Sequence, residues 1–175
     1  MKKVAKFSKV SYEQFEKDYT DTFGINEENI DANTRRAIES IYYGLELPQR
    51  STKYSAGYDF HSPIPFVLNP GETIKIPTTV RCEMEEDYVL MIFVRSSIGF
   101  KYLTNLVNNV AIVDCDYFYS DNQGHIFIKL VNRGDKPLQI RTGDSIAQGI
   151  FVAYGITEDD HVENTRNGGI GSTGR

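Results

Sequence analysis

Hydrophobic positions in the first quarter of the chain mostly follow the spacing of helices. The run VAKF at residues 4–7 is apolar enough for a short first strand. The stretch SYEQ at 11–14 has the Ser-x-x-Gln form of a capping box, and aromatic residues then share one helical face until Gly24. Apolar residues at spacings of three and four predict a second helix over about 27–43, ending near Gly44. We expect both faces to pack against the rest of the protein.

After Pro48 the pattern changes to short runs rich in β-branched and aromatic residues. The runs are IPFVL, ETIKIPTTV, YVLMIFV, VAIVD, HIFIKLV, PLQI and SIAQGIFVAY. Turn sequences such as NPG and RGDKP separate them. The pattern predicts a mainly β protein, a barrel or sandwich of the jelly-roll kind, with a helical segment at 11–44.

Composition and charge narrow the class of protein. The length of 175 residues suits one domain, spanning 1–175, and an apolar content of 40% is typical of a globular chain. The net charge of -5 argues against binding to nucleic acid or to a membrane surface, and no run of about 18 apolar residues predicts a membrane span. Cys82 and Cys115 have no metal-ligand spacing and no signal peptide pattern precedes them, so we expect a reduced, cytoplasmic protein.

Five stretches place polar or glycine residues where a β protein would prefer core or plain turn. They are AGYDF (56–60), VRSSIG (94–99), NNVAIVDCDY (108–117), GDSIAQ (143–148) and NGGIGSTG (167–174). In this order and spacing the set resembles the homotrimeric dUTPase family, over about residues 46–174. The resemblance implies a jelly-roll barrel with active sites at subunit boundaries. It also implies hydrolysis of dUTP to dUMP and pyrophosphate, which keeps uracil out of DNA and supplies dUMP for thymidylate synthesis.

Two residues of the third stretch are candidates for the chemistry. Asp114 matches the family's general base, and a carboxylate, ionised at neutral pH, can take a proton from the attacking water. Tyr117 resembles the tyrosine that packs beneath the deoxyribose and leaves no room for a 2′-hydroxyl. Asn108 and the backbone of Val110 and Ala111 match the hairpin that hydrogen-bonds uracil, although ordinary sheet pairing of these backbone groups remains open.

The other stretches supply candidate donors to the triphosphate. Arg95, Ser96 and Ser97 match the phosphate-binding motif, and a guanidinium group suits phosphoryl oxygens. Gln148 resembles the glutamine that reaches the phosphates. Asp59 either stabilises the fold, the interpretation that we favour, or orients metal-bound water. The resemblance also implies Mg²⁺, carried mainly on the triphosphate and keeping several waters.

The glycine-rich end of the chain, 166–175, is interpreted as a mobile lid. Its glycines let backbone N–H groups approach phosphates, and the family arm covers a neighbouring subunit's site. Arg166 is the candidate arginine for the γ-phosphate. The substrate-binding candidates within the lid are Ile170, Gly171, Ser172 and Thr173.

Two alternatives remain. The sister family, dCTP deaminase, shares the fold, but Lys129 stands where its catalytic glutamate would be. A regulatory binding protein is the second alternative, in which a protein partner docks on 11–44 or on the insertion at 118–123.

Overall fold

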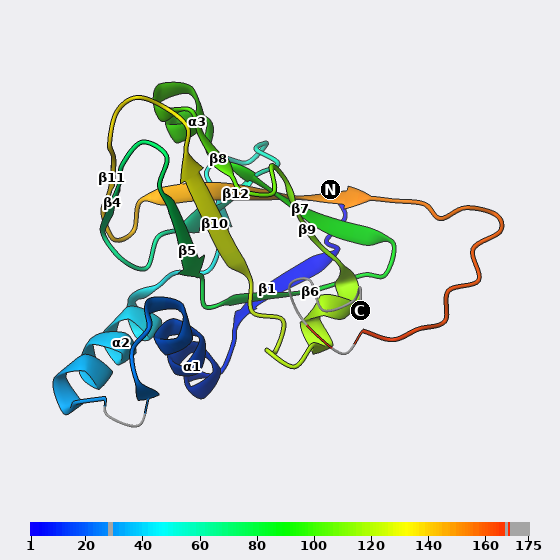
Figure 1. Ribbon diagram of the computed structural model, residues 1–175. Helices are drawn as coiled ribbons and strands as arrows, with labels where there is room; N and C mark the ends of the chain where they lie inside the picture. The colour runs from blue at the N-terminus through cyan, green and yellow to red at the C-terminus, as the bar shows by residue number, and fades with distance from the viewer. Residues whose placement is uncertain (28–29, 167, 169–175) are drawn as a thin grey trace.

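The computed structural model describes residues 1–27, 30–166 and 168, and Figure 1 gives the arrangement of the elements. The strands are β1 (Ala5–Lys9), β2 (Gln49–Arg50), β3 (Tyr58–His61), β4 (Phe66–Leu68), β5 (Thr73–Pro77), β6 (Val80–Met84), β7 (Tyr88–Val94), β8 (Thr104–Leu106), β9 (Ala111–Val113), β10 (Phe127–Asn132), β11 (Leu138–Ile140) and β12 (Ser145–Ala153). The helices are α1 (Tyr12–Phe23), α2 (Ala32–Gly44), α3 (Ser96–Tyr102) and the 3₁₀ helix η2 (Cys115–Tyr119).

The two N-terminal helices form as the sequence predicts, with one correction. Ser11 caps α1 by accepting a hydrogen bond from the Gln14 N–H, and Gly24 ends the helix at a φ of 66°. The second helix begins at Ala32 rather than near residue 27. The Asp31 carboxylate accepts hydrogen bonds from two backbone N–H groups of the first turn and so caps the helix there.

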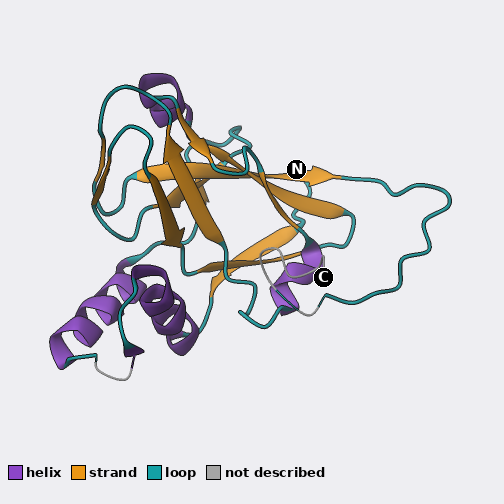
Figure 2. Cartoon of the chain, in the orientation of Figure 1, coloured by secondary structure: helices purple, strands orange, loops and turns teal. Residues whose placement is uncertain are grey.

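The described strands pair in four sheets (Figure 2). The largest has the order β2-β3-β12-β7-β9, and β12 pairs antiparallel with both β3 and β7. Smaller sheets are β5-β10-β8, β11-β4 and β1-β6. The prediction of a mainly β chain with N-terminal helices is therefore confirmed, while no closed barrel is detected among these strands.

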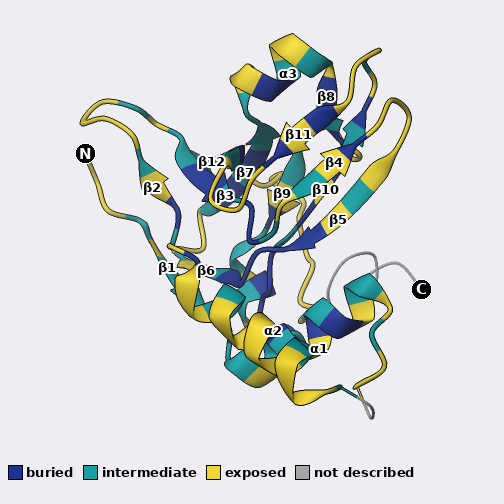
Figure 3. Cartoon of the chain, turned by 90° about the vertical axis from the view of Figure 1, so that its left-hand side faces the viewer, coloured by how far each residue is buried: buried dark blue, intermediate teal, exposed yellow. Residues whose placement is uncertain are grey.

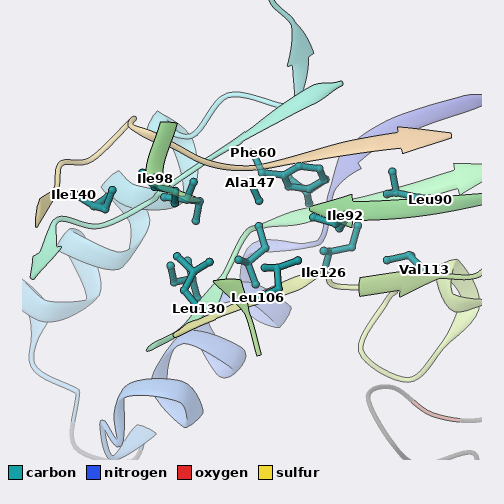
Figure 4. Close-up of a cluster of buried hydrophobic side chains, with 14 of the residues drawn as sticks. Phe60, Leu90, Ile92, Ile98, Leu106, Val113, Ile126, Leu130, Ile140 and Ala147 are labelled. Atoms are coloured by element: carbon teal, nitrogen blue, oxygen red, sulfur yellow. The ribbon is translucent and has the colours of Figure 1, made fainter. Parts of the chain in front are cut away.

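One hydrophobic core joins the sheets. Strands from all four contribute buried residues to it, among them Phe60, Ile76, Val80, Leu90 and Leu138, and Figure 4 shows part of this cluster. The helical pair has a small core of its own, built from Val10, Phe15 and Ile38, and the outer surfaces of both helices are exposed (Figure 3). The apolar faces of the two helices thus pack inward, as expected.

Several short strands and helices were not predicted from the sequence. Strands β2, β3, β6 and β8 and the helices α3 and η2 have few residues and mixed polarity, so periodicity does not identify them. Among the described helices, none has the length and apolar character needed to cross a membrane.

Candidate active site

A pocket of about 650 Å³ contains the residues of the third stretch. We call it the Asp114 pocket. Its lining residues are Lys75, Leu106, Val107, Asn108, Ala111, Ile112, Val113, Asp114, Tyr117, Ile126, Phe127, Ile128, Lys129 and Arg166. Strand β9 leads directly to Asp114, which precedes η2, so the strand end and the first helical turn place the carboxylate and the Tyr117 ring together.

Asp114 is bound by an arginine from the far end of the chain. Arg166 donates from Nη2 to Asp114 Oδ2 at 2.5 Å and from Nε to Asp116 Oδ1 at 2.8 Å. Its guanidinium carbon also lies 5.8 Å from the centre of the Tyr117 ring. Both carboxylates are half-exposed, so the ion pairs are open to competition from a ligand.

The Tyr117 ring lines the Asp114 pocket, and two hydrogen bonds fix its hydroxyl group. Its side chain is 7% exposed, and its hydroxyl donates to the His125 carbonyl at 2.7 Å. Asn122 Nδ2 donates to the same hydroxyl oxygen at 2.8 Å. Burial raises the pKa of Tyr117, so the hydroxyl stays protonated and the ring stays fixed.

The hairpin between β8 and β9 forms the rim of the pocket. Asn108 is exposed, Asn109 has a φ of 62°, and the Val110 N–H donates to the Asn108 carbonyl at 2.7 Å. Ala111 begins β9 opposite Ile92 of β7. The sheet pairing that remained open is therefore present at Ala111, while Asn108 lies at the exposed turn.

A second group of residues lies elsewhere: the predicted Arg95, Asp59 and Gln148, together with Ser51, which the sequence analysis did not name. We call this group the Arg95 cluster. Arg95 Nη1 donates to Asp59 Oδ2 at 3.1 Å, and Ser51 Oγ donates to the same oxygen at 2.8 Å. Gln148 pairs in register with Asp59. Asp59 is therefore bonded to two side chains of its own chain.

The backbone of Gly57 lies close to the side chain of Gln148 in this cluster. A Cβ on Gly57 would lie 2.5 Å from Gln148 Oε1, so a side chain there would displace the glutamine. Ser96 and Ser97 open α3 beside Arg95 and are exposed to solvent. The AGYDF, VRSSIG and GDSIAQ stretches therefore meet at one end of the large sheet.

The Asp114 pocket and the Arg95 cluster are separated along β7. Val113 is opposite Leu90, so Asp114 is level with Val89, six residues before Arg95. At about 3.3 Å per residue, this corresponds to about 20 Å. In Figure 1, α3 and η2 accordingly lie at different ends of the molecule. One chain does not bring the two groups of predicted residues together.

The pocket also contains residues that the motifs did not single out. Lys75 and Lys129 face each other across β5 and β10, and Lys75 Nζ lies 4.1 Å from the centre of the Phe127 ring. Alternation in the run HIFIKLV could have placed Lys129 on the face opposite the core. The pairing with Lys75 depends on sheet register, which the sequence does not reveal.

Part of the predicted lid is described. Arg166 is placed as above, against the pocket of its own chain. Ile170, Gly171, Ser172 and Thr173 lie outside the described residues.

The carboxylates of both regions are bonded within the protein. The described part of the chain contains no group of three or more His, Cys, Asp or Glu side chains placed to hold a metal ion. Asp59 is bonded to Arg95, and Asp114 and Asp116 are bonded to Arg166.

The fold and the site together define a class: a mainly β hydrolase with a carboxylate, an aromatic wall and separate arginine donors for anionic oxygens. The dUTPase family model matches residues 44–174. The deoxyuridine 5'-triphosphate nucleotidohydrolase of Lactococcus lactis is 37% identical over 134 residues, covering 75% of this chain and 89% of that protein. The chain therefore belongs to the dUTPase family.

Solved structures agree with that assignment. The dUTPase of Streptococcus mutans is similar with a TM-score of 0.58 and 33% identity, covering 64% of this chain and 88% of the other. A mutant dUTPase from phage phi11 of S. aureus matches with a TM-score of 0.57 and 25% identity, covering 69% and 91%. That structure is described as revealing the coordination of a structural Mg(II) ion.

Proposed function

We propose that this chain hydrolyses dUTP to dUMP and pyrophosphate, with Asp114 as the general base. The observation that carries the proposal is the placement of Asp114 and Tyr117 in one pocket behind an exposed hairpin. Water attacks the α-phosphorus and loses its proton to Asp114, a new P–O bond forms, and the bond to the pyrophosphate oxygen breaks. The reaction keeps uracil out of DNA and supplies dUMP for thymidylate synthesis.

The substrate is bound in three parts. Asn108 and the backbone of Val110 and Ala111 hydrogen-bond uracil, and the Tyr117 ring packs against the deoxyribose. The phosphates are held by a larger set of donors from two regions of the chain: Arg95, Ser96, Ser97, Gln148 and Arg166. The γ-phosphate competes with Asp114 for Arg166, which releases the base as the substrate binds. Within the lid, Ile170 covers the base, and Gly171, Ser172 and Thr173 add donors.

The complete site is assembled from several copies of the chain. The separation of about 20 Å between the Asp114 pocket and the Arg95 cluster supports this step, because one triphosphate must touch both. A homotrimer in which each site takes its base from one subunit and Arg95 from another meets the requirement. Residues 1–175 then form a single domain of jelly-roll type, and the one core shared by all four sheets supports that arrangement.

Members of the dUTPase family use Mg²⁺, and an ion carried on the triphosphate would neutralise charge at the phosphoryl oxygens. Asp59 would contact the ion through water, because Arg95 and Ser51 both bind its Oδ2 atom.

The test is the product released from each nucleotide. Incubation with dUTP should release pyrophosphate, and incubation with dCTP should release no ammonia. If the protein released ammonia from dCTP and left dUTP intact, it would be a deaminase, and the proposed function would be wrong. The sedimentation mass of the same sample gives the number of subunits, and a monomer that is fully active would contradict the shared site.

A further inference from the structure

The helical segment and the 118–123 insertion contact each other, although more than 70 residues separate them in the sequence. The backbone N–H of Ser11 donates to Gln123 Oε1 at 2.9 Å, and Gln123 Nε2 donates to Ser11 Oγ at 3.2 Å. One side-chain amide therefore binds both polar groups at the start of α1. In Figure 1 the loop after η2 runs toward this helix.

A buried pair makes the second connection. His125 is fully buried, and its Nδ1 lies 2.6 Å from Asp18 Oδ2 of α1. Its other ring nitrogen, Nε2, accepts the Thr79 N–H at 2.9 Å and so carries no proton. The proton is therefore on Nδ1, which donates to Asp18, and the imidazole is neutral. Both ring nitrogens are satisfied, and the ring orientation is fixed.

The same histidine holds Tyr117 through its backbone. The His125 carbonyl accepts the Tyr117 hydroxyl, and Asn122 binds that hydroxyl from the same loop. Gly124 has a φ of 72°, and a Cβ on it would lie 2.7 Å from the Phe118 Cα, so the loop closes tightly over η2. A continuous chain of contacts therefore runs from Asp18 through His125 to the Tyr117 ring.

We propose that α1 positions Tyr117 for discrimination against ribonucleotides, with Asp18 and His125 as positioning residues that fix the ring where the sugar binds. The proposal rests on the proposed function, because it assigns the Tyr117 ring to the sugar. To exclude a 2′-hydroxyl by shape, the Tyr117 ring must stay fixed. A displacement of about 1 Å in a catalytic site can lower the rate of reaction about a hundredfold. The helical segment then contributes to the selection of deoxyribonucleotides over ribonucleotides.

The experiment compares kcat/KM for dUTP with kcat/KM for UTP in the full-length protein. Asp18→Ala should lower the dUTP/UTP ratio by about tenfold, mainly by raising turnover of UTP. Asp18→Asn should restore most of the ratio, because its amide oxygen still accepts the Nδ1 proton. Asp21→Ala is the matched control on the same helix, since Asp21 is exposed and pairs with Lys17 at the surface. It should leave the ratio unchanged.

A double-mutant cycle tests the route through the hydroxyl. Tyr117→Phe should itself lower the ratio, and adding Asp18→Ala should then have little further effect. If Asp18→Ala does not fold, as judged by circular dichroism, Gln123→Ala removes the other connection and should lower the ratio in the same direction. An unchanged ratio in every folded variant would overturn the proposal. Failure of the wild-type protein to hydrolyse dUTP would instead overturn the proposed function, so the two failures are distinguishable.

Discussion

The Asp114 pocket and the Arg95 cluster contain different groups of the residues to which the proposed function assigns a role. The pocket has a carboxylate, an aromatic wall and apolar lining, but its arginine is bound to two carboxylates. The cluster has an arginine and exposed serines, but its carboxylate is bonded to that arginine and to Ser51. Under the proposed function, neither region would hydrolyse a triphosphate alone, and catalysis would require one chain's pocket to meet another chain's cluster.

The largest expected effect comes from the pocket. Asp114→Asn should lower kcat by about 10²–10⁴-fold, because the amide keeps the shape but accepts no proton. Binding of dUTP, measured by calorimetry, should remain. Asp116→Asn is the neighbouring control and should cost much less, since Asp116 contacts Arg166 but none of the other site residues that the structure describes. Full activity of Asp114→Asn would remove the base assignment.

Substitution of Arg95 in the Arg95 cluster should weaken the binding of dUTP and also lower the rate of its hydrolysis. Arg95→Ala removes a charged donor and leaves Asp59 without its charged partner, so kcat/KM for dUTP should fall by about 10–100-fold. Arg95→Lys should recover part of the loss, because it restores the charge without the planar fork. If Arg95→Ala changed only thermal stability and left kcat/KM intact, the cluster would be structural.

Arg166 connects the tail to the pocket, and its effect should be smaller. Arg166→Ala should raise KM for dUTP about tenfold, because one charge-assisted contact to the phosphates is lost. Deleting 166–175 should leave a folded protein that hydrolyses dUTP poorly. A truncated protein with wild-type kinetics would show that the tail has no part in the site.

The smallest effect concerns stability and pH. Burial lowers the pKa of His125, although Asp18 acts against it and Lys75 with it. The pKa of Asp18 is also lowered: burial opposes this, but the hydrogen bonds from His125 and Gln14 prevail. Below about pH 6.5 the unfolded histidine takes up a proton that the folded one does not, so stability falls by up to about 1.4 kcal/mol per pH unit.

Urea unfolding between pH 5 and 8 measures this dependence. Protonation of Asp18 also lowers the stability of the folded protein as the pH falls. Because the pKa of Asp18 is lowered, this loss comes at a lower pH than the loss from His125, below the ordinary pKa of an aspartate. A His125→Gln variant should have a flatter profile than the wild-type protein over about pH 5–6.5. Parallel profiles would mean that His125 is already protonated in the folded chain.

What could be predicted from the sequence depended on how local each feature is. The Ser11 cap and the Asp114–Tyr117 spacing involve neighbours in the chain, so residue types and short spacings were sufficient. The predicted start of α2, near residue 27, is wrong because Glu27 and Glu28 also suit a helix start, and only the structure shows that Asp31 is the cap. The Arg95–Asp59 and His125–Asp18 pairs depend on long-range packing that no periodicity reveals.

Subunit mixing tests the central claim most directly. Asp114→Asn chains and Arg95→Ala chains, each nearly inactive alone, are denatured together in equal amounts and refolded. In a trimer whose sites take the base and the arginine from different subunits, about a quarter of the sites receive both intact residues, and about a quarter of the wild-type activity should return. If the mixture is no more active than its parents, the two regions do not combine across chains, and the shared site is contradicted.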